Sequence, residues 1–197
     1  MYTVMGSSRT RTFRVLWLLE ELGLDYEHVP AGPRSPDVIE HYPAGKVPVL
    51  LAEGAALTDS TAIMTFLADR HDGLTFPAGT IKRALQDGHT NFLLDEFDAC
   101  LWTGARHSFV LPENERVPDV KDSLRKEFSR SQKRFVDRLG AGPFLMDDAM
   151  TIADIVAVHC GDWAAVAKFP VTEPAFRDYL RRMRERPAYQ RARDSAG

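Results

Sequence analysis

The loop Ser7–Thr12 is the first of three segments with side chains that could do chemistry, and it precedes an apolar stretch that favours helix. Its hydroxyl and guanidinium groups, together with backbone N–H groups at a helix start, could stabilise a thiolate. The same residue types also suit a loop that only caps the helix, because Ser and Thr are favoured at N-caps. Both interpretations stay open at this point.

The second segment is Val47-Pro48-Val49-Leu50-Leu51, an apolar strand with a proline inside it. Proline has no N–H to donate to a strand ladder, so Pro48 requires an explanation. Either the strand lies at a sheet edge, or the Val47–Pro48 bond is cis and turns the Val47 backbone outward. In the second case, Val47 could pair with an extended, peptide-like ligand as if the ligand were an added strand.

The third segment is Thr58-Asp59-Ser60-Thr61-Ala62-Ile63, at the start of another helix. Free N–H groups at a helix start attract carboxylates, and the helix dipole adds to this attraction. Asp59 could hold an ammonium group in addition. The segment therefore suits an α-amino-acid head group, and a plain N-cap is the alternative.

The elements that carry these segments predict a mixed α/β domain over residues 1–75. Alternating and helical apolar patterns give the order β-α-β-α-β-β-α. The first β-α-β unit predicts a parallel crossover. The expected elements are strands at Tyr2–Met5, Asp25–Val29, 47–51 and 55–57, and helices at 11–22, 35–41 and 60–71.

Residues 76–80 are predicted to be a linker, because Gly and Pro gather between residues 72 and 79. Residues 81–197 are predicted to be an all-helical domain. Its expected helices lie at 81–107, 119–139, 151–166 and 174–185. Thr151 and Asp154 are spaced as a capping box, which concerns folding and carries no chemistry.

Composition excludes several classes of function. The chain has 197 residues, 44% of them apolar, and a net charge of -3, which argues against a general polyanion binder. The arginines from Arg177 to Arg193 are interpreted as a solvated helix face, so no nucleic-acid partner is expected. No apolar run approaches the roughly 20 residues of a spanning helix, and the six histidines show no metal-ligand spacing, so neither membrane nor metal is expected.

The two cysteines, Cys100 and Cys160, lie far apart in the sequence and form no C-x-x-C motif. They are expected to be buried thiols, which is typical of a reducing compartment. A cytoplasmic location is therefore predicted.

At the three segments named first, the sequence resembles the cytosolic glutathione S-transferase family, most of all bacterial members with a Ser- or Thr-bearing loop. The resemblance covers nearly the whole chain, and the order and spacing of its motifs are more specific than any one of them. The motifs are Phe13–Glu27, Pro43–Leu50, Asp59–Ile63, Thr151–Ile155 and Arg186–Tyr189.

The resemblance implies a thioredoxin-like N-terminal domain, a helical-bundle C-terminal domain, a homodimer, and glutathione as co-substrate without a metal. Carried over by position, Lys46 would meet the glycyl carboxylate of glutathione. Val47, beside cis-Pro48, would contact its backbone, and Asp59 and Ser60 would hold its γ-glutamyl head. The electrophile would lie near the long helix that contains Phe97, Trp102 and Arg106.

The loop has no tyrosine or cysteine at the position that contacts the glutathione sulfur in many family members. Counting back from Gly23 without gaps places Arg9 at that position, with Ser8 and Thr10 on either side. Ser8 or Thr10 could donate a hydrogen bond to the sulfur, or Arg9 could stabilise the thiolate by its charge. These three residues are the catalytic candidates.

The implied activity is conjugation of glutathione thiolate to small hydrophobic electrophiles, a reaction of detoxification. Two alternatives remain. One is glutathione-dependent reduction of disulfides or peroxides on the same fold, and the other is a non-catalytic protein that binds glutathione or a partner.

Overall fold

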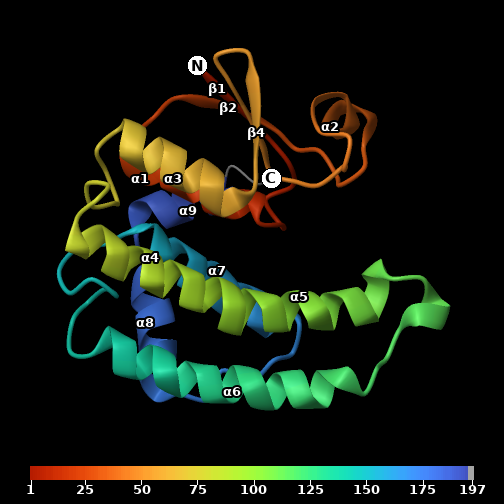
Figure 1. Cartoon of the computed structure of the whole chain (residues 1–197), viewed down its shortest axis with the longest axis vertical. Coiled ribbons are helices and arrows are strands. Elements are labelled where there is room, and N and C mark those ends of the chain that lie inside the picture. The colour runs from red at the N-terminus through yellow and green to blue at the C-terminus, as the bar shows by residue number, and fades with distance from the viewer. Residues whose placement is uncertain (195–197) are drawn as a thin grey trace. The chain divides into compact units, whose positions relative to one another are not determined.

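The computed structural model describes residues 1–194, and contacts within it divide the chain into two compact units. The first unit contains Met1–Ala78 and the segment that starts at Arg184, and the second contains Gly79–Met183. Figure 1 shows the strands of the first unit in red to orange and most of the second unit in yellow-green to blue.

The first unit is built on a four-stranded mixed sheet. Strands β1 (Tyr2–Met5) and β2 (Tyr26–Val29) are parallel, whereas β3 (Val49–Ala52) is antiparallel to β1 and to β4 (Ala55–Thr58), in the order β2-β1-β3-β4. Helices α1 (Thr12–Leu22), α2 (Pro36–His41) and α3 (Ser60–Arg70) complete the predicted order of elements. This is the topology expected of a thioredoxin-like domain. Pro48 lies just before β3 rather than inside it, so the strand is shorter than predicted.

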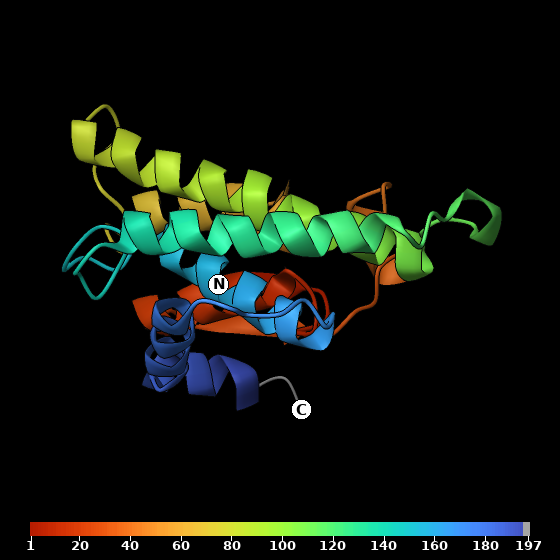
Figure 2. The same ribbon diagram turned by 90° about the horizontal axis from the view of Figure 1, so that it is seen from below.

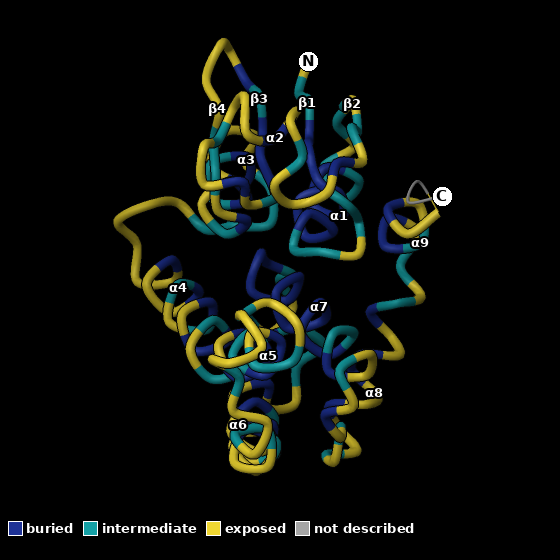
Figure 3. Tube along the Cα trace, turned by 90° about the vertical axis from the view of Figure 1, so that its right-hand side faces the viewer, coloured by how far each residue is buried: buried dark blue, intermediate teal, exposed yellow. Residues whose placement is uncertain are grey.

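Helix α1 is the most buried helix of this unit. Its residues from Thr12 to Leu19 are all buried, and they appear dark blue in Figure 3. The helix ends where Gly23 takes a left-handed φ of 64°, and the N–H of Leu24 then donates to the Leu19 carbonyl. A glycine at this position ends a helix without the steric cost of a Cβ atom.

A helix that the sequence did not predict, α9 (Pro187–Asp194), packs on α1. The ring of Tyr189 lies edge-on to Phe13, at 5.3 Å between centroids, and to Trp17, at 5.1 Å. Assigning the whole of residues 81–197 to the helical domain therefore differs from the structure, because these rings bury α9 against the first unit.

Two arginines of the predicted solvated face are likewise engaged in ion pairs. Arg186 binds Glu21 through Nε and Nη2, at 2.6 and 2.8 Å, and the Glu21 side chain is only 9% exposed. Arg191 binds Glu20 at 2.7 Å. Arg186 departs from the prediction, because it is half-buried in an ion pair with a residue 165 positions away in the sequence. The Arg191 side chain is still 56% exposed, as expected of a solvated face.

The second unit consists of helices, as predicted. The expected helix 81–107 comprises α4 (Ile81–Leu93) and α5 (Ala99–Ala105), with π-helical segments at Leu94–Asp98 and Arg106–Val110. Figure 2 shows α6 (Val120–Leu139) beside the continuous helical stretch that α4 and α5 form. A short 3₁₀ turn (Glu113–Glu115), α7 (Ile152–Val166) and α8 (Pro174–Arg184) complete the unit.

Phe97 lies at the centre of the second unit's aromatic core. It is fully buried, and its ring is 5.0 Å from Phe128 and 5.7 Å from Phe176. The Phe97 side chain is therefore not available to an electrophile, and the placement of the electrophile near this long helix stays a prediction. Trp102 is half-buried and Arg106 is exposed.

The predicted capping box at the start of α7 is confirmed. Asp154 is completely buried, and its carboxylate accepts from the N–H groups of Thr151 and Leu145 and from the hydroxyls of Thr151 and Tyr179. Burial raises the pKa of Asp154, and these donors act in the opposite direction. Within residues 1–194, no helix is long and apolar enough to cross a membrane.

Candidate functional site

The strand register brings the three predicted segments to one end of the sheet. Met5, the last residue of β1, is paired with Val49, the first of β3, and Val49 is paired with Thr58, the last of β4. The loop after Met5, the Val47–Pro48 bond before Val49 and the Asp59–Ser60 pair after Thr58 therefore start from one row of neighbouring residues. Three short polar segments that are distant in sequence thus meet in space.

Gly6 forms the junction between the first two segments. Its φ is 138°, and a Cβ atom at this position would lie 2.1 Å from Thr12 Oγ1 and 2.9 Å from the Cβ of Val47. The Gly6 N–H donates to the Val29 carbonyl at 3.0 Å, and His28 Nε2 binds the Gly6 carbonyl at 2.8 Å. The loop is thus held against both β2 and the residue before Pro48.

The three catalytic candidates in the loop differ in the hydrogen bonds that their side chains make. The Thr10 hydroxyl donates to the Ser7 carbonyl at 2.6 Å and also lies 2.9 Å from Thr12 Oγ1. The hydroxyl of Ser8 binds no residue among those described, and the Arg9 side chain is exposed without an ion pair to a described residue. A hydroxyl has one proton, so Thr10 could donate to a ligand only by giving up its present bond.

The Val47–Pro48 peptide bond is cis, so the second of the two explanations for this proline is confirmed. Neither the N–H nor the C=O of Val47 is bonded to a residue that the structure describes. Half-buried Val47 therefore offers a free donor and a free acceptor beside β3. Lys46, the preceding residue, is exposed and makes no ion pair within the described chain.

Asp59 both caps α3 and keeps one carboxylate oxygen free. Its Oδ1 accepts from the N–H groups of Thr61 at 2.8 Å and Ala62 at 3.0 Å, whereas Oδ2 binds nothing in residues 1–194. Its backbone has φ 69° and ψ 121°, an unfavourable conformation for a residue other than glycine. Backbone strain of this kind concentrates at functional sites. The N-cap alternative is thus correct for Oδ1, and Oδ2 remains able to hold an ammonium.

Ser60 follows Asp59 and is 3% exposed. Its Oγ lies 3.3 Å from Nη1 of Arg14, a residue of α1 that is 0% exposed. Helix α1 is thereby connected to the start of α3.

Comparisons with known proteins agree with this arrangement. The family model described as "Glutathione S-transferase, N-terminal domain" matches residues 10–70. A zeta-class glutathione S-transferase of Euphorbia esula is 28% identical over 193 residues, which span 92% of this chain and 82% of that protein. A solved glutathione transferase of Methylococcus capsulatus is 27% identical, with a TM-score of 0.87 over 100% of this chain and 99% of the other.

Over residues 10–70 the chain therefore matches the N-terminal domain of glutathione S-transferases, and over nearly its whole length it is similar to proteins of the cytosolic glutathione S-transferase family. The fold class predicted from the sequence, a thioredoxin-like domain followed by a mostly helical region, is confirmed. The matching relatives and solved structures are glutathione S-transferases, and this similarity supports an enzyme of the same type. A theta-class glutathione S-transferase of Xanthomonas axonopodis pv. citri, solved with glutathione bound, has the same fold (24% identity, TM-score 0.78, 97% of this chain and 96% of the other).

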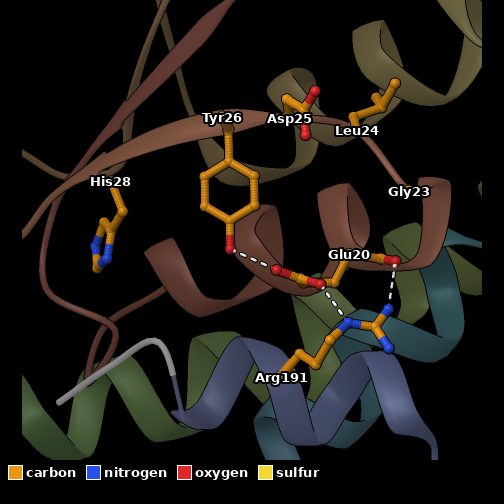
Figure 4. Close-up of a pocket in the computed structure, with 7 residues that line it drawn as sticks. All are labelled: Glu20, Gly23, Leu24, Asp25, Tyr26, His28 and Arg191. Atoms are coloured by element: carbon orange, nitrogen blue, oxygen red, sulfur yellow. Dashed lines mark hydrogen bonds and ion pairs between the residues drawn. The ribbon is translucent and has the colours of Figure 1, made fainter.

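A separate open cavity of about 540 Å³ lies beside β2 and contains none of the predicted site residues. Figure 4 shows the Tyr26 hydroxyl and Arg191 meeting at Glu20 on its wall. The carboxylate of Glu20 is thus already bound by these two partners. No cluster of His, Cys, Asp or Glu suited to a metal ion occurs within residues 1–194.

Cys100 lies in the second unit, where burial and the neighbouring Glu127 raise the pKa of its thiol to about 12. Its Sγ is 3.7 Å from Glu127 Oε2. Cys160 is completely buried. Cys100 therefore offers no thiolate at neutral pH, and Cys160 is closed off from solvent.

We expect Cys100 in the folded protein to resist alkylation by iodoacetamide at pH 8. The variant Glu127→Gln should speed the reaction several-fold, because it removes the negative charge that raises the pKa of the thiol. Mass spectrometry of timed samples measures the rate. Asp137→Asn, which removes an exposed carboxylate from the same helix, is the control and should leave the rate unchanged. Rapid labelling of Cys100 in the unmodified protein would contradict the prediction.

Three residues that hold the site in place were not found from the sequence: Gly6, Arg14 and His28. Gly6 could have been suspected as a glycine directly after a strand. Arg14 is one of several charged residues in an otherwise apolar helix, and nothing local distinguishes it. The role of His28 depends on strand pairing, which the sequence pattern does not specify in register.

Proposed function

We propose that this chain conjugates the thiolate of glutathione to small hydrophobic electrophiles. The observation that carries the proposal is the unsatisfied backbone of Val47 at the same sheet end as Asp59, Ser60 and the hydroxyl-bearing loop. Glutathione offers a peptide group for Val47, an α-amino-acid head for the start of α3 and a thiol for the loop. The bound glutathione in the theta-class structure of the same fold supports this assignment.

The proposed binding residues are those predicted from the sequence. Val47 pairs with the cysteinyl backbone beside cis-Pro48, and Lys46 attracts the glycyl carboxylate. Asp59 Oδ2 holds the γ-glutamyl ammonium, and Ser60 donates to its carboxylate. Each group of the ligand then meets a protein group of opposite charge or hydrogen-bonding character.

For catalysis, we assign the sulfur-binding hydroxyl to Ser8, with Arg9 adding positive charge. Thr10 is not assigned this role, because its hydroxyl proton is already donated to the Ser7 carbonyl. The thiolate attacks the electrophile, a carbon–sulfur bond forms, and the leaving group departs with the electron pair of its bond. A free thiol of pKa about 8.5 is only about 3% ionised at pH 7, so a donor to the sulfur raises the reactive fraction.

Ser8→Ala is expected to lower kcat/KM for an aryl halide about 10-fold, with the Kd for glutathione nearly unchanged. The loss is moderate because a less stabilised thiolate is a stronger nucleophile. Thr10→Val should keep the bound thiol's ionisation, which the ultraviolet difference spectrum of the glutathione complex measures. Ser7→Ala is the neighbouring comparison, because it removes another hydroxyl from the same loop, one whose Oγ accepts from the Arg9 N–H. Loss of thiolate in Thr10→Val or Ser7→Ala, but not in Ser8→Ala, would refute the assignment.

Calorimetry with glutathione, followed by turnover assays, tests the reaction itself. Turnover of an aryl halide supports conjugation. Turnover of only a mixed disulfide or a hydroperoxide would assign the reductase alternative. That alternative must use glutathione thiols alone, because both cysteines are buried. Binding without turnover would assign a non-catalytic role, and absence of binding would refute the proposal.

The proposal includes a homodimer in the cytoplasm. On α4, Ile81 is 79% and Leu85 56% exposed, and residues four apart lie on one face of a helix. A second copy would cover this apolar face. Gel filtration should give about 44 kDa, twice the 22.1 kDa of one chain, and a mass of one chain would refute the dimer. Two unpaired buried cysteines support a reducing compartment.

A further inference from the structure

Arg14 is a fully buried cation on an otherwise apolar face of α1. Burying a charge costs free energy unless the charge is compensated by specific interactions. Its Nη1 reaches the Ser60 hydroxyl at 3.3 Å, at the first residue of α3. A side chain that only fills space between two helices would not need a charge.

The contact with Arg14 fixes the direction of the Ser60 hydrogen bond. A guanidinium group has only donors, so Ser60 Oγ must accept from Arg14, and the single hydroxyl proton is left to donate elsewhere. Among residues 1–194, neither this proton nor the Ser60 backbone N–H has an acceptor. Ser60 therefore carries two unused donors although it is only 3% exposed.

The other donors at the start of α3 are already occupied. The N–H groups of Thr61 and Ala62 bind Asp59 Oδ1, and the N–H of Ile63 binds the Asp59 carbonyl. The unmet donors of this helix start are thus concentrated on Ser60, with the charge of Arg14 directly behind them. Such an arrangement is complementary to a carboxylate.

We propose that Arg14 is a positioning residue for the α-carboxylate of the γ-glutamyl group. This inference rests on the proposed glutathione site. Arg14 holds the Ser60 hydroxyl with its proton directed outward and supplies positive charge behind it. The ammonium of the same head group goes to Asp59 Oδ2, so the two charges of the zwitterion are distinguished by position. The site consequently prefers an α-amino-acid head over a simple amine or a simple acid.

The test compares three ligands by calorimetry. The first two are glutathione and the analogue in which γ-aminobutyrate replaces the γ-glutamyl group, so that the α-carboxylate is absent and the ammonium is kept. A third ligand, the γ-glutamyl α-amide, removes only the carboxylate charge. Arg14→Met is expected to weaken glutathione binding about 10-fold, as for loss of a charge-assisted hydrogen bond. It should leave the affinities of the other two ligands within about twofold, and kcat at saturating glutathione should be preserved.

The matched control is Thr65→Val, which removes another hydroxyl from α3 and should change no affinity. Arg14→Lys keeps a charge but has a shorter, single-ended donor, and it should weaken glutathione several-fold without affecting the α-amide. This variant decides the matter if Arg14→Met does not fold, which circular dichroism reports.

Equal losses for glutathione and the α-amide in a folded variant would overturn the inference and assign Arg14 a purely structural role. Unchanged glutathione affinity in folded Arg14→Met, or in Arg14→Lys when Arg14→Met does not fold, would overturn it as well. If the unmodified protein shows no heat with glutathione, the proposed function itself fails, which is a distinguishable result.

Discussion

Gly6→Ala is expected to abolish measurable glutathione binding. A methyl group at this position would lie 2.1 Å from Thr12 Oγ1 and 2.9 Å from the Val47 Cβ, and the φ of 138° is rarely adopted by alanine. Relief of the overlap must move the loop, Val47 or both. We expect the free energy of unfolding to fall by about 3 kcal/mol, through strain at a special backbone position.

Calorimetry with glutathione and urea unfolding monitored by tryptophan fluorescence measure the two effects of Gly6→Ala. Gly32→Ala, in the same unit, is the control, because a Cβ atom there has no neighbour within 4 Å. That variant should keep both affinity and stability. Normal glutathione affinity in Gly6→Ala would show that the junction at Gly6 does not position the site.

Asp154→Ala is expected to destabilise the second unit by about 4 kcal/mol. The substitution leaves two backbone N–H groups and two hydroxyls without their acceptor in a completely buried place, and each unsatisfied group costs about 1–3 kcal/mol. Asp154→Asn should cost nearly as much. Each carboxylate oxygen accepts from two donors, so the amide NH₂ must face one pair of them.

Unfolding in urea, followed by circular dichroism, measures the loss caused by the Asp154 variants. Asp148→Ala removes an exposed carboxylate from the preceding loop and is expected to change stability by less than about 0.5 kcal/mol. If Asp154→Asn were as stable as the unmodified protein, the carboxylate would not be the acceptor for all four donors.

Elements with a clear local pattern were predictable from the sequence. The apolar face that ends at Gly23, the β-prone residues of β1 and the Thr151–Asp154 spacing are each local in the sequence. The π-helical segments at Leu94–Asp98 and Arg106–Val110 were not predictable, because each keeps the chain helical while changing its hydrogen-bond pattern. Helix α9 was missed because it is held by contacts of Tyr189 and Arg191 with α1, which lies at the far end of the sequence.

The candidate site was predictable in its positions but not in its hydrogen bonds. The Val47–Pro48 and Asp59–Ser60 pairs stood out by residue type, and the strand register brings them together. The choice between Ser8 and Thr10 depends on a single bond from Thr10 to the Ser7 carbonyl, which only the folded loop reveals. The contact between Arg14 and Ser60 could not be predicted, because it exists only where α1 and α3 are adjacent in the fold.

The packing of α9 on α1 has a consequence for biosynthesis. Trp17 is completely buried in the finished protein, and Tyr189, at the other end of the chain, is one of the residues that cover it. A ribosome makes the N-terminal residues first, and domains generally begin to fold as they emerge. In the nascent chain, part of α1 therefore stays uncovered until the residues around Tyr189 have been translated and have left the ribosome.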